Sequence, residues 1–215
     1  MKLLRPAISL FVVLSILTGV AYPLVITGIA QLAFPHQANG SIIIRAGTSA
    51  GSTLIGQPFS DPKYFWGRLS ATSPVPYTAF NAEALTGSSG SNLAQSNPAF
   101  RANIDARIDA LAAADKAAGF ERPRSPAGKP ASSAIPVDLL TSSASGLDPH
   151  ISPEAAAYQV PRVALARGLR ESVVLEQVRL HTTPRQLGFL GEPVVNVLAL
   201  NMALDGLSVP KAPTE

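Results

Sequence analysis

The stretch PAISLFVVLSILTGVAYPLVITGIAQLAF, residues 6–34, decides the architecture of this chain. No charged side chain occurs between Arg5 and His36. A helix rises about 1.5 Å per residue, so about 20 apolar residues cross the roughly 30 Å hydrocarbon core of a bilayer. No second stretch of comparable length and apolarity follows. The pattern predicts one transmembrane helix over residues 7–34, preceded by a short terminus of residues 1–6.

A cleaved secretory signal is the competing interpretation, because Lys2 and Arg5 precede the run and Gly19-Val20-Ala21 could serve as a cleavage site. The apolar region of a signal is about 7–15 residues long, and this run is longer, which favours an uncleaved anchor. Pro23 lies in the middle of the run and lacks a backbone donor. We therefore expect a kink in the helix near Pro23.

The basic residues beside the span predict its orientation. Lys2 and Arg5 precede the run, and the next basic residue is Arg45. Basic residues next to a span stay on the cytoplasmic side. We expect a single-pass protein of the cell inner (plasma) membrane, with a cytoplasmic N-terminus and a periplasmic or extracytoplasmic domain over residues 35–215. The chain has no cysteine, which excludes disulfides and thiolate metal sites.

The remainder of the chain has nearly balanced charge. Lys2 and Arg5 account for two of the 17 basic residues, so 15 face 14 acidic residues beyond the span. Nucleic acid is not an expected partner, because phosphate binding needs a concentrated basic surface. The lipid bilayer is the expected partner of the helix.

Strand-like and helix-like segments alternate irregularly in this remainder, which predicts an α+β fold: a single N-terminal transmembrane helix followed by one extracytoplasmic soluble domain. Strands are expected at Ser41–Ile44, Tyr64–Leu69 and Val137–Thr141. Residues 120–134 contain three prolines and predict an exposed excursion.

Four helices are expected in the soluble part, and their ends follow from capping residues. The first starts at Asn97-Pro98 and ends at Gly119. The second starts at Ser152-Pro153 and ends at Gly168, with a kink or shortening at Pro161. The third and fourth are expected over residues 171–181 and 193–207.

Catalytic patterns are weak in this sequence. Gly128-Lys129 lacks the glycine and hydroxyl spacing of a P-loop. Ser60-Asp61-Pro62-Lys63 has serine and lysine at S-x-x-K spacing, but the supporting motifs of that enzyme class are absent. The glycine-rich segment 87–92 is typical of a surface loop, although its backbone could bind an anion.

Asp148, His150 and Glu154 lie close together in the sequence and could form a hard-ion site. The same segment also fits a local structural role. Asp148 before Pro149 is suited to an Asx turn, and Ser152 is suited to a helix cap. We favour the structural interpretation, with no metal site and no catalytic residue.

Long segments of this chain resemble the C subunit of the Kdp potassium-transporting ATPase. The resemblance rests on the basic start, the span through Ala21-Tyr22-Pro23, and four further segments. These are GSTLIGQPFSDPKYFWGRLSAT (51–72), SSGSNLAQSNP (88–98), VDLLTSSASGLDPHISPEAAAYQVPRVALARG (137–168) and GEPVVNVLALNMALD (191–205). The chain departs from the family pattern at Leu69, usually proline, and at Ser89, usually glycine.

The resemblance implies a non-catalytic, membrane-anchored subunit of an ATP-driven, high-affinity potassium uptake complex. The implied partners are a potassium-binding pore subunit and a P-type ATPase subunit. The implied roles are assembly of the complex and support of ATP binding by the catalytic subunit. No cofactor is expected to bind this chain directly, and ATP is implied only for the complex. The family motifs give these candidates for subunit contact or structure: Gly56, Gln57, Ser70, Ser91, Asn92, Asn97, Asp138, Asp148 and His150.

Two other classes of protein stay open at this point. One is an anchored periplasmic adaptor or binding domain of an unrelated system, which would purify without a pump. The other is a secreted hydrolase using Ser60 and Lys63, which a covalent serine probe would label.

Overall fold

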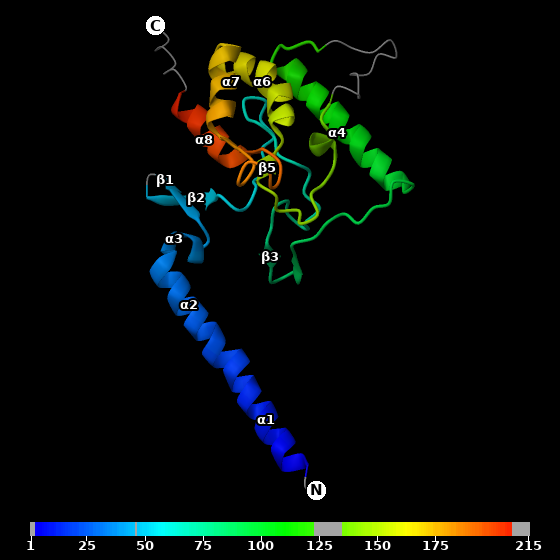
Figure 1. Cartoon of the computed structure of the whole chain (residues 1–215). Helices are drawn as coiled ribbons and strands as arrows, with labels where there is room; N and C mark the ends of the chain where they lie inside the picture. The colour runs from blue at the N-terminus through cyan, green and yellow to red at the C-terminus, as the bar shows by residue number, and fades with distance from the viewer. Residues whose placement is uncertain (1–2, 46, 123–134, 208–215) are drawn as a thin grey trace. The chain divides into compact units, whose positions relative to one another are not determined.

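A computed structural model describes residues 3–45, 47–122 and 135–207 of the chain. The chain divides into two compact units, Met1–Ser52 and Thr53–Glu215 (Figure 1). The first unit contains the long apolar helix, and the second contains a mixed helix and strand domain. This arrangement confirms the expected α+β fold with one long apolar N-terminal helix.

The apolar helix of the first unit is continuous from Leu4 to Ala33. It consists of α1 (Leu4–Ile16), a π-helical turn (Leu17–Ala21) and α2 (Tyr22–Ala33). Its mean hydropathy is 2.2, and none of its most apolar stretch is buried against other described residues. By length and composition it is long enough to cross a bilayer. The π-helical turn ends two residues before Pro23, whose missing N–H interrupts the regular bonding of an α-helix.

The rest of the first unit is short. It consists of α3 (Pro35–Ala38) and a hairpin of β1 (Ile42–Arg45) and β2 (Thr48–Ser52). The strands pair antiparallel from Ile42 opposite Ser52 to Arg45 opposite Thr48, with a bulge after Ile43. The strand expected around residues 41–44 is therefore confirmed.

The second unit contains five helices and five short strands among its described residues (Figure 1). The helices are α4 (Pro98–Ala117), α5 (Val137–Leu140), α6 (Pro153–Arg167), α7 (Glu171–Leu180) and α8 (Val197–Gly206). The strands are β3 (Phe80–Asn81), β4 (Thr86–Gly87), β5 (His150–Ile151), β6 (Thr182–Thr183) and β7 (Val194–Asn196).

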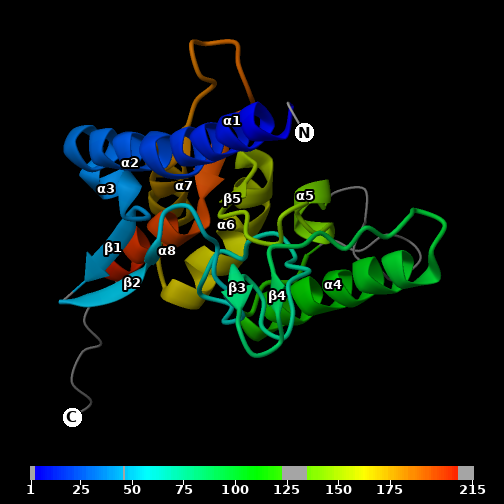
Figure 2. The same cartoon turned by 90° about the horizontal axis from the view of Figure 1, so that it is seen from below.

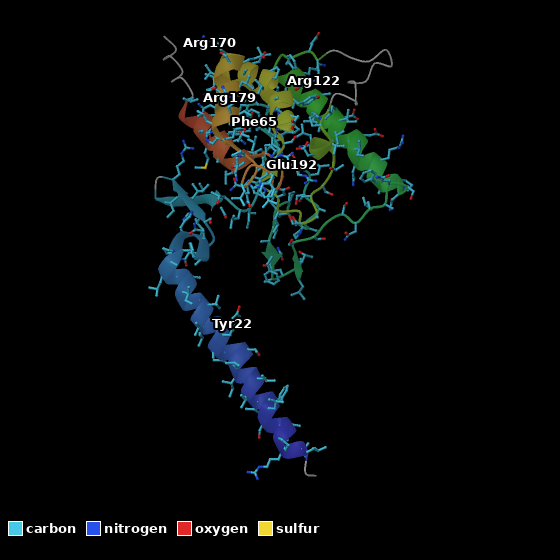
Figure 3. All side chains as sticks on the ribbon, viewed as in Figure 1. Tyr22, Phe65, Arg122, Arg170, Arg179 and Glu192 are labelled. Carbon is cyan, nitrogen blue, oxygen red and sulfur yellow. The ribbon has the colours of Figure 1, made fainter. Side chains whose placement is uncertain are left out.

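A small antiparallel sheet in the order β5-β7-β6 and the helices α6, α7 and α8 enclose the core. Val195 of the central strand pairs with Ile151 on one side and Thr182 on the other. The core is aliphatic with two aromatic members, Phe65 and Trp66. Phe65 is fully buried, and Figure 3 shows its side chain inside the domain. Burial of this apolar surface is the main contribution to stability.

The predicted helix ends are confirmed by capping geometry. The Asn97 side chain accepts a hydrogen bond from the Ala99 N–H at 2.9 Å. The Ser152 hydroxyl accepts one from the Ala155 N–H at 3.0 Å. Gly168 ends α6 with a φ of 65°, a left-handed conformation that glycine adopts readily. The helix α6 continues through Pro161 to Arg167 and is not shortened there.

The strand expected at Val137–Thr141 was wrong, because this segment forms the single helical turn α5. Leu139 and Leu140 are both buried. Successive side chains of a strand point to opposite faces, so a strand on the domain surface would expose one of the two. The turn also lets the Thr141 hydroxyl donate to the Val137 carbonyl.

The helix expected over residues 193–207 starts later than predicted. Val194–Asn196 forms β7, and the Asn196 side chain caps α8 by accepting from the Ala199 N–H at 3.0 Å. Asparagine is a favoured N-cap residue, so Asn196 was a sequence signal for the observed start of α8 at Val197. Most of the excursion expected over 120–134 lies outside the described residues.

Candidate functional site

The prediction of a strand over Tyr64–Leu69 was also wrong. Side chains from two helices bond the backbone of this segment at the centre of the domain. Asn201 of α8 accepts from the Phe65 N–H at 2.8 Å and donates to the Phe65 carbonyl at 2.9 Å. Gln159 of α6 does the same for Trp66, at 2.9 and 3.1 Å. Two buried amide side chains thus take the place of a neighbouring strand. Only Leu69 keeps an isolated bridge, to Ser142.

A buried arginine extends this contact. The Arg162 guanidinium donates to the Pro62 carbonyl at 2.7 Å and the Tyr64 carbonyl at 3.1 Å. Its charge lies 3.6 Å from Asp115 of α4, which also pairs with Arg122 at 2.9 Å. Burial lowers the pKa of Arg162 to about 10, and the Asp115 charge partly opposes this shift. We call Gln159, Arg162 and Asn201 the backbone clamp.

Next to the residues held by the backbone clamp, Arg68 bonds the segment that contains Asp148. The Arg68 guanidinium donates to Asp148 at 3.2 Å and to the Ser142 carbonyl at 3.2 Å. Asp148 also accepts from the His150 N–H at 3.0 Å, which closes the predicted Asx turn, and lies 3.6 Å from the His150 ring. Burial alone would raise the pKa of Asp148. The hydrogen bonds from His150, together with the Arg68 and His150 charges, outweigh burial and lower the pKa.

Ser70 and Gly56 hold neighbouring loops against this segment. The Ser70 hydroxyl donates to the Gly146 carbonyl at 2.7 Å and accepts from the Tyr77 N–H at 2.9 Å. The Gly56 N–H donates to the Leu147 carbonyl at 2.9 Å. A Cβ at position 56 would lie 2.9 Å from the Asp148 carbonyl oxygen and closer still to the Tyr77 ring. Glycine is therefore needed at position 56 for close approach.

Two hollows flank residues 67–72. One, of about 530 Å³, is lined by Leu54, Arg68, residues 143–145 and residues 147–149, which include Asp148. The other, of about 380 Å³, lies between α4 and loops that contain Ser70 and Ser91. Arg107 lines the second hollow and donates to the Gly67 and Leu139 carbonyls at 2.7 and 2.9 Å. Burial lowers the pKa of Arg107 to about 10.

The structure brings Gly56, Ser70, Asp148 and His150 together around residues 146–150, and Ser91 lines one hollow with Ser70. Asp138 of α5 accepts from the Ser152 N–H at 2.7 Å, beside the start of α6. Gln57 is partly buried next to Gly56, and Asn97 caps α4. Ser91 and Asn92 are exposed, and Asn92 has a φ of 51°. Each bond of Asp138 and Asn97 is to the backbone of the same domain.

The chemistry available at this site is limited. Among residues 3–45, 47–122 and 135–207, no group of three acidic or histidine side chains is placed to hold a metal ion. The Lys63 ammonium lies 3.6 Å from Asp61 and over the Tyr64 ring, and no hydrogen bond between Ser60 and Lys63 is recorded among the described residues. The geometry supports contact and structure better than catalysis.

Sequence reasoning missed the backbone clamp, Arg68 and Arg107. One usable signal was Asn201, a lone amide within the apolar surface of a predicted helix. Such a residue is depleted from helix interiors unless its side chain has a bonding role. Arg68 had no local signal, because its partner Asp148 is 80 residues away.

The fold and the site together define a class: a protein with one bilayer-length apolar helix and an α+β domain whose polar groups bond mainly to its own backbone.

Comparison with known proteins specifies the family. Residues 4–206 match the family described as "KdpC: K+-transporting ATPase, c chain". The protein from Sorangium cellulosum is 57% identical over 94% of this chain and 97% of its own length. Those from Dechloromonas aromatica (56% identical, over 96% and 98%) and Herpetosiphon aurantiacus (55%, over 94% and 94%) are similar. All three are named "Potassium-transporting ATPase KdpC subunit".

The chain belongs to this family, which confirms the resemblance seen in the sequence. It is accordingly a non-catalytic accessory subunit. The match covers helix and domain alike, so the hydrolase and the unrelated adaptor are both excluded. The roles of the candidate residues in subunit contact stay predictions.

Proposed function

We propose that this chain is a membrane-anchored subunit that supports assembly of an ATP-driven, high-affinity potassium uptake complex in the cell inner membrane. The observation that carries the proposal is the family match over residues 4–206, which includes the apolar helix. The proposed partners are a potassium-binding pore subunit and a P-type ATPase subunit of the same complex.

The helix supports the anchoring role by its composition. Between Arg5 and His36 it contains no Asp, Glu, Lys, Arg or His, whereas ion paths and proton relays in membranes usually use such groups. Ser15 and Gly19 are four residues apart and form a small surface on which a partner helix could pack closely. Lys2 and Arg5 favour a cytoplasmic N-terminus and an extracytoplasmic domain.

The domain supports a scaffolding role. The backbone clamp and the Arg68–Asp148 pair fix loops that would otherwise be loosely held, so their exposed surfaces keep one shape for binding. We propose that four of the candidates contribute to subunit binding indirectly, by fixing the shape of these loops: Gly56, Ser70, Asp148 and His150.

ATP binding by the catalytic subunit is proposed to depend on this chain only through the assembled complex. With an extracytoplasmic domain, the chain does not meet cytoplasmic ATP, and no cofactor is assigned to it. Nucleotide affinity of the complex should therefore fall when the chain is removed, and the purified chain alone should not bind ATP.

The first test is co-purification in mild detergent. A tagged copy of this chain should retain the pore and ATPase subunits in fixed ratio, and its deletion should abolish potassium uptake at low external potassium. Recovery of a chain that binds neither subunit would refute the assembly role.

The second test concerns topology and uses the absence of native cysteine. Ala82→Cys, on an exposed turn between β3 and β4, should react with an impermeant maleimide in cells whose outer membrane has been made permeable. Leu3→Cys is the matched control, because it precedes the span and is 83% exposed, and it should react only after lysis. The reverse pattern would overturn the orientation.

A further inference from the structure

A hairpin extension between α7 and β7 presents an apolar surface that the proposed function does not use. Its base is the pairing of β6 with β7. Beyond the base the chain continues as PRQLGFLGEP, residues 184–193. Figure 2 shows this orange segment extending away from the helices of its own domain. We call Leu187, Phe189 and Leu190 the apolar tip.

The apolar tip is unusually exposed. Leu187 is 83% exposed, Phe189 68% and Leu190 48%. Single exposed apolar residues are ordinary on soluble domains. Three within four residues, at the end of a projecting hairpin, form a contiguous surface of the kind that marks an interaction site.

The backbone of the tip is already organised for a water-poor environment. Gln186 and Leu190 exchange two hydrogen bonds, each of 2.9 Å. The Gly188 N–H donates to the Arg185 carbonyl and the Phe189 N–H to the Gln186 carbonyl, both at 3.2 Å. A backbone polar group that enters hydrocarbon must be bonded internally, and these bonds meet that need for the N–H groups of Gln186, Gly188, Phe189 and Leu190.

The turn is also held in one shape. Leu187 has a φ of 54°, which is uncommon for a leucine, and Gly188 and Gly191 have φ values of 81° and 74°. Behind the turn, Arg185 and Glu192 form an ion pair across the hairpin. Figure 3 labels Glu192 on this extension. We call this ion pair the polar collar, because it lies between the apolar tip and the base of the hairpin.

Strand β7, which forms the base of the hairpin, is bonded at its far end to the first residue of the second unit. Asn196 of β7 donates to the carbonyl of Thr53 at 2.8 Å. Thr53 is the first residue of the second unit, so the chain arrives there from the unit that contains the apolar helix. Strand β7 is therefore tied to the start of the domain's own chain.

We propose that the apolar tip inserts into the interfacial region of the lipid bilayer in which the chain's own helix is anchored, and so fixes the domain's orientation at the membrane surface. The proposal needs an anchored chain, but not the presence of the other subunits. Because the apolar helix tethers the domain to the bilayer, the effective concentration of lipid surface near the tip is high. A contact of only three side chains can then be sufficient for binding to the bilayer.

The chemistry of the tip favours lipid over a charged partner. Residues 186–191 carry no charge, and the collar of Arg185 and Glu192 is balanced. Leucine and phenylalanine are residues that peripheral proteins place at the boundary of headgroups and acyl chains. Insertion should therefore occur in neutral phosphatidylcholine, with no need for anionic lipid.

The test uses nitroxide labels on single cysteines of the full chain, reconstituted in phosphatidylcholine vesicles. The label is placed at Phe189→Cys, and its accessibility to oxygen, which concentrates in lipid, is compared with that to a water-soluble nickel chelate. Val137→Cys is the matched control, because Val137 is 73% exposed on α5, away from the hairpin. The oxygen-to-nickel ratio should be several-fold higher at position 189 than at 137, and Leu187→Cys should resemble position 189.

Two outcomes would overturn the proposal. Equal ratios at 189 and 137 would show that the tip lies in water. Shielding of the 189 label from both reagents, in the chain alone or in the assembled complex, would show that protein covers the tip. Neither result depends on the co-purification or Ala82 labelling experiments, so failure of this inference is distinguishable from failure of the proposed function.

Discussion

Replacing Gln159 by leucine tests whether the backbone clamp holds the domain together. Gln159 is fully buried on α6, and its amide is bonded on both sides. It accepts from the Trp66 N–H at 2.9 Å and donates to the Trp66 carbonyl at 3.1 Å, and it accepts from Arg162 at 2.6 Å. Leucine has a similar size, so the change removes the bonds without leaving a large cavity.

The expected cost follows from the groups left without partners. Gln159→Leu leaves the N–H and the carbonyl of Trp66 buried and unbonded, and each such group costs about 1–3 kcal/mol. Leucine recovers part of this by its favourable transfer from water. We expect the free energy of unfolding to fall by about 2–5 kcal/mol, a large share of the 5–15 kcal/mol typical of a domain.

The assay is urea unfolding of the full chain in mild detergent, followed by fluorescence. Trp66 is the single tryptophan of the chain and lies at the altered contact, so its emission reports directly on this contact. With a urea slope of about 2 kcal/mol per molar, the midpoint should fall by about 1–2.5 M. Gln95→Leu, on an exposed turn, is the matched control and should change stability by less than about 0.5 kcal/mol.

A Gln159→Leu midpoint within error of the Gln95→Leu midpoint would refute the reasoning. It would mean that Trp66 finds other partners, or that residues 64–66 are not held by side-chain amides.

Two further predictions concern buried and half-buried charges. Asp115→Ala leaves the buried Arg162 without its carboxylate and should lower the free energy of unfolding by about 3–5 kcal/mol, measured against exposed Asp109→Ala as control; equal midpoints would contradict it. Asp148→Asn keeps an acceptor for the Asx turn but loses the charge opposite Arg68. Because the folded pKa of Asp148 is lowered, its charge stabilises above the unfolded pKa of about 3.9 and is lost as pH falls through the folded value. The wild type should therefore exceed Asp148→Asn in free energy of unfolding at pH 7, and this difference should shrink as the pH falls to 3. A difference that does not change with pH would count against the Arg68–Asp148 pair.

The candidate site was predictable from the sequence only in part. Asp148 and Ser152 were expected to form a turn and a cap, and both do. These bonds join residues two or three positions apart, so the sequence contains both partners within one short segment. Arg68, which completes the site around Asp148, had no such local partner.

The sequence by itself determined the apolar helix and the helix ends at Asn97, Ser152 and Gly168. Transfer of side chains to a bilayer and capping of a helix depend on composition or on neighbours within one turn. The tertiary structure alone decided the conformation of residues 64–66. Their aromatic pattern is typical of a strand, but Gln159 and Asn201 come from 93 and 136 residues further along the chain to bond their backbone. Buried N–H and carbonyl groups need partners, and which partners reach them depends on how distant helices pack.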